Sequence, residues 1–395
     1  MKLTYFTLAF MACAFIANAQ SMEGSKIGKG IRFMPKDSSF SIQWNTRFQN
    51  LYEGKYNLDS EEYNDKFLIR RFRLKFKGYL VNPKLQYKIE LAMSNRDQKN
   101  ANPEDGSNIV LDAVVKYRFH PNWQLWVGQT KLPGNRERVI SSGNLQFVDR
   151  SYLNKQFTID RAKGIQIRHE HSLGNIVLRE IGAVTMGDGR NNINNNTGGY
   201  DYTFRGEILP FGKFTNKGDY FGSDLARESS PKLSIGVTFD YNQDTKNTGG
   251  QIGQALEDTE STLGNIVIDA MFKYKGFSFM GEYDDKWVES GDATSGTTSD
   301  GSELPFYTGN ALNVQAGYLF KSNYEVAGRF TMVQPENTVK ALGTDFNSNR
   351  YSIGFSKYIA GHTVKIQSTV SYVDYETIND ADDEMQFLMQ MEIGF

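Results

Sequence analysis

Between residues 71 and 77, basic side chains occupy every second position, and large apolar side chains fill the positions between them. The basic members of this run are Arg71, Arg73, Lys75 and Lys77. In an extended strand alternate side chains point to opposite faces, so these cations would stand in one column, about 6.6–6.8 Å apart. Such a column can pass an anion along, because no single position holds it too tightly. The run therefore predicts a path for anions along one face of a strand.

A later alternating segment extends this column with Lys116 and Arg118, although Asp112 shares their face. The alternative interpretation is that charges on a wet face are ordinary and carry no function. Other segments offer balanced charges, such as Lys88 with Glu90. The excess of basic residues in the first column therefore favours an anion path over a simple polar lining.

The elements that would position these residues are strands, because apolar and polar residues alternate along most of the chain from Phe40 onwards. Alternation over nine or more residues is typical of a strand with one apolar and one wet face. Sixteen such segments are predicted, at about 39–53, 67–81, 84–95, 109–120, 122–131, 162–171, 176–186, 200–211, 231–243, 263–275, 276–289, 307–320, 324–334, 349–359, 362–375 and 385–395.

The links between these segments alternate between short turns, such as 275–276, and long polar loops, such as 132–161 and 290–306. This is the plan of an outer-membrane barrel, which has short periplasmic turns and long external loops. A soluble β-sandwich is the alternative, but its strands are usually five or six residues long. The one break in the alternation of links is 212–230, a longer stretch where a turn is expected. The sequence predicts an all-β fold, a 16-stranded antiparallel transmembrane β-barrel, which would close around an aqueous channel.

Composition excludes two other classes of protein. The chain has 395 residues and a formal net charge of −2, whereas a nucleic-acid-binding domain would be strongly basic. A helical membrane protein needs runs of about 20 apolar residues, and the only run that comes close is at the extreme N-terminus.

Both ends of the chain point to export. A basic start, an apolar stretch and a cleavage site at Ala17-Asn18-Ala19 predict a secretory signal, which would remove Cys13, the one cysteine. The final segment alternates throughout and ends on Phe395, which looks like the signature by which outer-membrane barrels are recognised for assembly. The segment after the signal either enters the channel mouth or stays mobile. The predicted domains are residues 1–19 as the signal peptide, 20–38 as a periplasmic N-terminal segment and 39–395 as the barrel.

The longest link, residues 132–161, is the third external loop and the candidate constriction. It carries Arg138 and Arg150. It also carries apolar anchors, which are Val139, Ile140, Leu145, Phe147 and Tyr152. A loop with its own apolar cluster can fold inward and pack on the barrel wall. The alternative is a surface loop packed on its neighbours.

Several stretches resemble the phosphate-selective porin O and P family, with features of its Bacteroidetes-type members. They are Ile69-Arg70-Arg71-Phe72-Arg73-Leu74 with Gly78, residues 128–134, Glu137-Arg138, Ser141-Ser142 and Asp149-Arg150-Ser151. The resemblance implies a homotrimeric, anion-selective channel whose arginines and lysines relay phosphate or similar anions. By position, Arg70, Arg71 and Arg73 match the family's strand motif, and Arg138 and Arg150 match its basic loop positions. Strict alternation would put Arg70 on the lipid side unless a bulge turns it inward.

We therefore predict an outer-membrane porin, a passive channel for phosphate or phosphate-like anions, without a cofactor. The expected partners are these anions, outer-membrane lipid and lipopolysaccharide, and two further copies in a homotrimer. A general, weakly selective porin is one alternative, and a barrel that acts through its loops as an adhesin or enzyme is another. The predicted anion-binding residues are Arg70, Arg71, Arg73, Lys75, Lys77, Lys116, Arg118, Arg138 and Arg150.

Two other kinds of site are not predicted. No phosphate-binding loop, zinc-protease or nucleophile-elbow motif occurs, so no motif supports an enzyme. His169 and His171 could suggest a metal site, but the sequence shows no third ligand beside them, and such pairs are more often surface residues.

Overall fold

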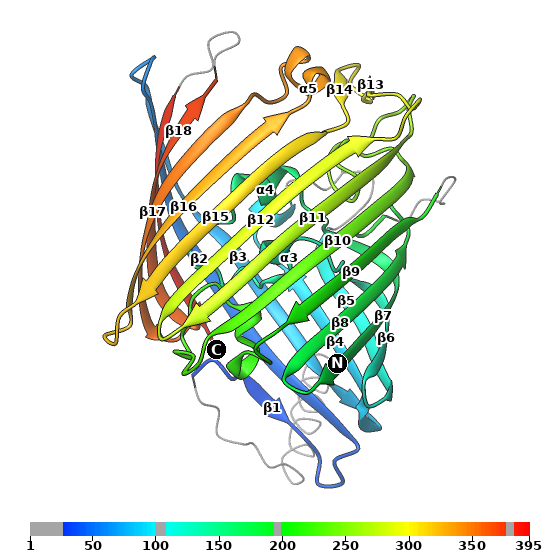
Figure 1. Ribbon diagram of the computed structural model, residues 1–395, viewed down its shortest axis with the longest axis vertical. Coiled ribbons are helices and arrows are strands. Elements are labelled where there is room, and N and C mark those ends of the chain that lie inside the picture. Colours follow the sequence, from blue (N-terminus) through cyan, green and yellow to red (C-terminus); the bar gives the residue numbers. More distant parts are fainter. Residues whose placement is uncertain (1–26, 99–107, 193–198, 377–382) are drawn as a thin grey trace, which may run out of the picture.

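The computed structural model describes residues 27–98, 108–192, 199–376 and 383–395. Within these residues, sixteen strands form a closed antiparallel barrel, as Figure 1 shows. The ring closes where the last strand pairs with the first, from Gly394 opposite Arg47 to Glu384 opposite Asn57. The predicted fold class is confirmed. The signal peptide predicted over residues 1–19 lies outside the described residues.

Each predicted segment corresponds to one barrel strand. The barrel strands are β2 (Phe40–Asn57), β3 (Tyr63–Leu80), β4 (Asn82–Ala92), β5 (Val110–His120), β6 (Trp123–Lys131), β7 (Arg161–Leu173), β8 (Ile176–Thr185), β9 (Asp201–Leu209), β10 (Lys232–Thr245), β11 (Ser261–Tyr274), β12 (Phe277–Val288), β15 (Gly309–Leu319), β16 (Tyr324–Pro335), β17 (Ser348–Ala360), β18 (Val364–Tyr375) and β19 (Glu384–Gly394). The shorter elements are β1 (Ile31–Phe33), β13 (Ser295–Thr297), β14 (Glu303–Pro305), α2 (Asn95–Gln98), α3 (Arg136–Val139), α4 (Tyr152–Gln156), α5 (Asn337–Ala341) and the 3-10 segment η2 (Thr215–Tyr220).

The largest difference from the predicted boundaries is in the β2–β3 hairpin. Pairing continues to Tyr56 opposite Tyr63, so the predicted loop 54–66 shortens to 58–62. The residues added to the strands are mostly polar on both faces. Beyond the lipid both faces of a hairpin are wet, so the apolar alternation ends there while the backbone pairing continues.

The outer face of the barrel is apolar and the inner face is polar. On β10, Ile235, Val237 and Phe239 are exposed, whereas Ser234 and Thr238 are buried inside the barrel. On β19 the exposed residues include Met385, Phe387, Met389 and Met391. Closure pairs the strand backbones with each other, which hydrocarbon requires. No helix in the described part of the chain is long and apolar enough to cross a membrane.

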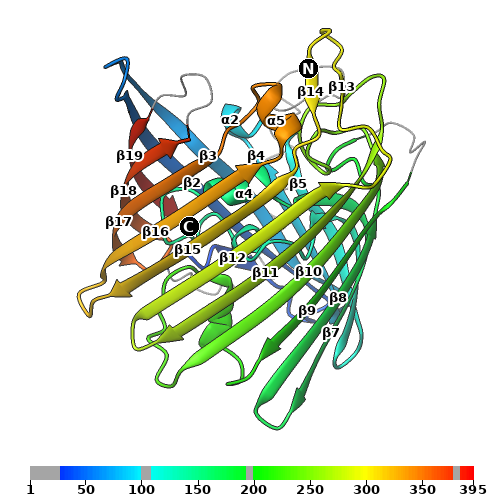
Figure 2. The same cartoon turned by 45° about the horizontal axis from the view of Figure 1, so that its top comes forward.

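Short turns lie at one end of the barrel and long loops at the other, where Figure 2 shows α5 and the β13–β14 hairpin. At the turn end, β1 pairs with Ile42–Trp44 of β2, beyond the point where β19 stops. Residues of the N-terminal segment thus lie beside the opening at the turn end of the barrel.

Two segments fill part of the interior. Residues 132–160 enter from the loop end and carry α3 and α4, which Figure 1 shows within the ring of strands. Residues 210–231 enter from the turn end. The first interior cluster consists of Ile140, Leu145, Val177, Leu209, Phe214, Met271 and Met280. A second cluster packs Leu153 and Phe157 of the loop on Ala311 and Val333 of the strands. The interior beside β8–β12 and β15–β16 is therefore packed.

Candidate functional site

The interior beside β3–β7 is hollow and forms two cavities. The larger, of about 1830 Å³, reaches the loop end, where Arg96 and Asp300 line it. The smaller, of about 1170 Å³, reaches the turn end, where Lys29 and Phe395 line it. Three residues line both cavities, namely Arg73, Lys75 and Ser141. The two cavities therefore meet between β3 and the inward loop, and two of the three residues at that place are basic.

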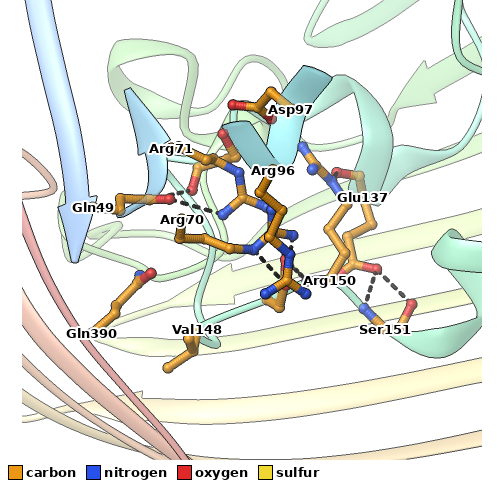
Figure 3. Close-up of polar contacts among 12 residues, drawn as sticks. Gln49, Arg70, Arg71, Arg96, Asp97, Glu137, Val148, Arg150, Ser151 and Gln390 are labelled. Carbon is orange, nitrogen blue, oxygen red and sulfur yellow. Dashed lines mark hydrogen bonds and ion pairs between the residues drawn. The ribbon is translucent and has the colours of Figure 1, made fainter. Parts of the chain in front are cut away.

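Asp149 fastens the loop to β3. Its Oδ2 accepts a hydrogen bond from Arg70 Nη2 at 2.7 Å, and its Oδ1 accepts one from Arg71 Nη2 at 2.8 Å. Arg71 also donates to Gln49 at 2.8 Å (Figure 3). Burial alone would raise the pKa of Asp149, but the two guanidinium charges and their hydrogen bonds hold it well below its usual range.

Arg70 and Arg71 reach the same carboxylate because the strand is irregular at this point. The pairing register of β2 and β3 shifts between Gln49 and Asn50, which leaves Arg70 as the extra residue of a β-bulge. Ile69 remains exposed on the outer face. The bulge turns Arg70 inward, whereas strict alternation would have placed its side chain on the lipid-facing side.

The two predicted loop arginines have different partners. Arg138 Nε donates to Asp160 Oδ1 at 2.8 Å. Arg150 instead donates to the backbone oxygens of Glu137 and Ile140, at 3.0 and 2.8 Å. Among the described residues no carboxylate lies within ion-pair distance of Arg150, and burial together with Arg138 and Arg71 lowers its pKa. Arg150 therefore adds to the larger cavity, which it lines, a charge that forms no direct ion pair with a described carboxylate.

The basic column on β3 is compensated unevenly. Arg73 Nη1 lies 2.7 Å from Asp97 Oδ2, and Lys75 Nζ lies 3.4 Å from Glu90 Oε2. In the described ranges Lys77 has no carboxylate partner, and it pairs in register with Lys88 of β4. The column thus loses its acidic partners toward the periplasmic end.

Strands β5–β7 continue the basic inner surface, and two of their cations lie over an aromatic ring. Lys116 Nζ lies 3.5 Å and Arg168 Cζ 4.3 Å from the centre of the Trp126 ring. All three residues line the larger cavity, and within the described chain neither cation is ion-paired to a carboxylate. The ring holds both cations in place through its electron-rich face. Arg118 is exposed near the end of β5 and lines neither cavity.

Trp126 and Arg168 were not among the predicted residues. A signal existed, because Gln166 and Arg168 alternate with Ile165 and Ile167, the pattern that marked the column on β3. The arrangement of these groups, a water-accessible path with excess positive charge, suits the passage of anions rather than a covalent reaction.

The family model of the phosphate-selective porin O and P family matches residues 42–395. The chain belongs to this family. It is an outer-membrane porin, and both the family and the fold indicate a channel rather than an enzyme. None of the curated proteins searched matches the sequence.

Solved structures of porins share the fold of this family member at low sequence identity. The anion-selective porin from Comamonas acidovorans has 9% identity and a TM-score of 0.54, with 90% of this chain and 100% of that chain covered. The high-pH structure of Pseudomonas putida OprB has 8% identity and a TM-score of 0.57, with 90% and 94% covered. The trimer form of Vibrio cholerae OmpT has 12% identity and a TM-score of 0.52, with 90% and 99% covered.

Residues 210–231, which contain the unusually long predicted link 212–230, cover the packed side of this porin's interior at the turn end. Lys273 Nζ donates to three backbone oxygens of the segment, those of Gly218, Phe221 and Ser223, at 2.7–2.8 Å. The amide of Gly222 donates to the Asn144 oxygen of the inward loop at 2.8 Å. The two inserted segments therefore brace each other inside the barrel.

A buried ion network holds the packed side together. Arg136 of α3 pairs with Glu207 and with Asp269, the latter at 2.9 Å between Nε and Oδ1. Arg205 pairs with the same two carboxylates at 3.0 and 2.6 Å. These four side chains are all nearly inaccessible to solvent. Because each cation in this network has carboxylate partners, the network fixes the loop and offers little free charge to the channel.

Proposed function

We propose that this porin is a passive, anion-selective channel for phosphate or phosphate-like anions. One observation carries the proposal: Arg73 and Lys75 are two of the three residues that line both cavities. An anion that crosses the barrel by this path must pass these side chains. Because each is partly neutralised by a carboxylate, it can attract the anion without trapping it.

Cations that form no ion pair with a described carboxylate would attract the anion on either side of this point. Lys77 lines the smaller cavity, and Lys116, Arg150 and Arg168 line the larger one. Phosphate binds well to such groups, because each ammonium or guanidinium donates charge-assisted hydrogen bonds to its oxygens. These cations would form several weak positions in sequence, which conduction requires.

The remaining predicted residues take supporting places in this proposal. Arg70 and Arg71 are engaged by Asp149 and set the position of the loop, and Arg138 is engaged by Asp160. Arg118 lies near the periplasmic end of β5. It would affect only the electrostatic potential outside the narrow part of the path.

We also propose a homotrimer in contact with lipopolysaccharide and phospholipid. The apolar outer face supports contact with lipid, and one fold neighbour is described as a trimer form. Mass measurement by light scattering in detergent would give three chains per particle. A monomer mass would contradict the trimer and leave the channel proposal standing.

The test of the proposed function is a current measurement on the purified protein in a planar lipid bilayer. Phosphate added to a KCl solution is expected to reduce the chloride current, because both anions use the same basic positions. The Lys116→Gln/Arg168→Gln variant should require roughly tenfold more phosphate for the same reduction, since hydrogen bonds to charged groups are lost. Arg118→Gln is the matched control and should behave as the wild type.

A chloride current that phosphate leaves unchanged would contradict the proposal and favour a general, weakly selective porin. Equal loss of the phosphate effect in Arg118→Gln would contradict the assignment of the effect to the wall around Trp126.

A further inference from the structure

A group of potential metal ligands lies on the outer face of the barrel, away from the channel. On β7, Ile165 and Ile167 are exposed on the outside, and His169 and His171 follow at the same alternate positions. Glu180 of β8 lies directly opposite His169 in the strand register. The tight turn 174–175, a few residues away, joins β7 to β8, so the group lies near the periplasmic rim.

The ligand atoms lie near the spacing of a metal site. His169 Nδ1 lies 2.9 Å, and His171 Nδ1 3.8 Å, from the same oxygen, Oε2 of Glu180. One ligand atom from each side chain can be chosen so that all lie within 4.8 Å of one another. Zinc bonds of about 2.0–2.2 Å in a tetrahedron put ligand atoms roughly 3.3 Å apart, and the two measured distances bracket this value.

The described protein groups do not fully neutralise or hydrogen-bond these side chains. Within the described part of the chain, Glu180 has no arginine or lysine partner, and its ion-pair partners are the two imidazoles. In the same residues His171 Nδ1 is buried and has no hydrogen-bond partner. A bound divalent cation would neutralise the carboxylate and occupy the free imidazole nitrogen at once.

The surroundings hold the first ligand rigidly. The Trp123 ring stacks on His169 at 4.2 Å between ring centres, and the two histidine rings stack at 4.9 Å. The three side chains are 21–40% exposed, so the group lies at the surface of the barrel. The sequence alone offers only the two histidines and no third ligand, because Glu180 lies on the neighbouring strand and joins them only through the register.

We propose that His169, His171 and Glu180 bind one divalent transition-metal ion of the zinc class. Two imidazole nitrogens and one carboxylate oxygen suit such an ion, and three protein ligands leave one tetrahedral position open toward the membrane interface. This site is separate from the channel, so it does not depend on the proposed function.

Zn²⁺ titration by calorimetry tests the site, with chelator-treated protein purified through a tag that contains no histidine. The wild type should bind one Zn²⁺ per chain. His171→Ala and Glu180→Gln should each weaken binding by roughly 100-fold or more, because loss of an outer-shell partner alone already costs 10–100-fold. His120→Ala is the matched control, since it removes another exposed histidine, and it should leave binding unchanged.

Co²⁺ in place of Zn²⁺ gives a second readout. The wild type should show the visible absorption of four-coordinate Co²⁺, and both ligand variants should lose it. Absence of Zn²⁺ binding in the wild type would overturn the proposal. So would wild-type affinity in the Glu180→Gln variant, which keeps the shape of the side chain and has its folding checked by circular dichroism.

Discussion

Arg136 and Lys116 are both cations inside the barrel, but their surroundings are opposite. Arg136 is 1% exposed and contacts two carboxylates, Glu207 and Asp269. Lys116 borders the larger cavity and lies over Trp126, with no carboxylate in ion-pair distance among the described residues. The packed side of the lumen thus neutralises its cations, whereas the open wall leaves several of them available. Charge that is already paired holds the structure, and charge that faces water without a partner is available to a passing ion.

The largest expected effect follows from removing a paired cation on the packed side. Arg136→Ala leaves Glu207 and Asp269 with one guanidinium fewer, and breaking a buried pair costs about 3–5 kcal/mol. We expect the free energy of unfolding, measured by urea in detergent, to fall by about 3 kcal/mol. Lys77→Ala on the open wall is the control and should change it by less than about 0.5 kcal/mol. Similar losses in the two variants would remove the distinction between the two sides.

The next largest effect is expected from the ion pairs that join the inward loop to β3. Asp149→Asn keeps the size of the side chain but removes the charge that holds Arg70 and Arg71. We expect a loss on the order of 2 kcal/mol in unfolding free energy, and larger fluctuations of the open-channel current as the loop loosens. Glu257→Gln removes a carboxylate from the same cavity and should change neither quantity. A quiet current in Asp149→Asn would show that the apolar anchors alone position the loop.

Reversing charge on the open wall tests the other side. Lys116→Glu with Arg168→Glu replaces attraction by repulsion, on the order of 1 kcal/mol for each interaction across water. The permeability ratio of chloride to potassium should therefore fall by roughly tenfold, as measured from reversal potentials in a salt gradient. The unfolding free energy should change little. An unchanged ratio would mean that the ions do not pass this wall.

The smallest effect concerns pH. The lowered pKa of Asp149 means that its carboxylate stabilises the fold fully above about pH 4, where the unfolded chain is also ionised. Below that pH the unfolded chain binds its proton first, so the stabilisation decreases progressively until the pH reaches the folded-state pKa. The difference in unfolding free energy between wild type and Asp149→Asn should be constant from pH 7 to about 4.5 and shrink below it. A difference that already disappears near pH 5.5 would contradict the lowered pKa.

The fold could be predicted because lipid imposes a simple rule on the sequence. Every strand that crosses hydrocarbon must alternate, so each barrel strand appears in the sequence as a period-two segment, β19 most clearly. The rule weakens outside the lipid, which is why the β2–β3 hairpin extends further than predicted. It also does not say where a longer link goes, and residues 210–231 could be recognised as unusual without indicating that they enter the barrel.

Which cations of the inner face are neutralised by a carboxylate was harder to predict than which residues lie on that face. Alternation places Arg73 and Lys77 on the inner face, but it cannot show that Asp97 neutralises Arg73 while no described carboxylate neutralises Lys77. Those pairings depend on loops that are distant in sequence. The family resemblance named Arg70, and the register shift between β2 and β3 explains how its side chain turns inward.

The reversal potential of the wild-type protein in a planar bilayer under a KCl gradient tests the central claim most directly. If the unpaired cations of the open wall govern permeation, the potential will have the sign of chloride selectivity and will shrink as added salt screens the wall. A potential near zero, or one of the opposite sign, would contradict this account and make the basic wall a polar lining without influence on which ions pass.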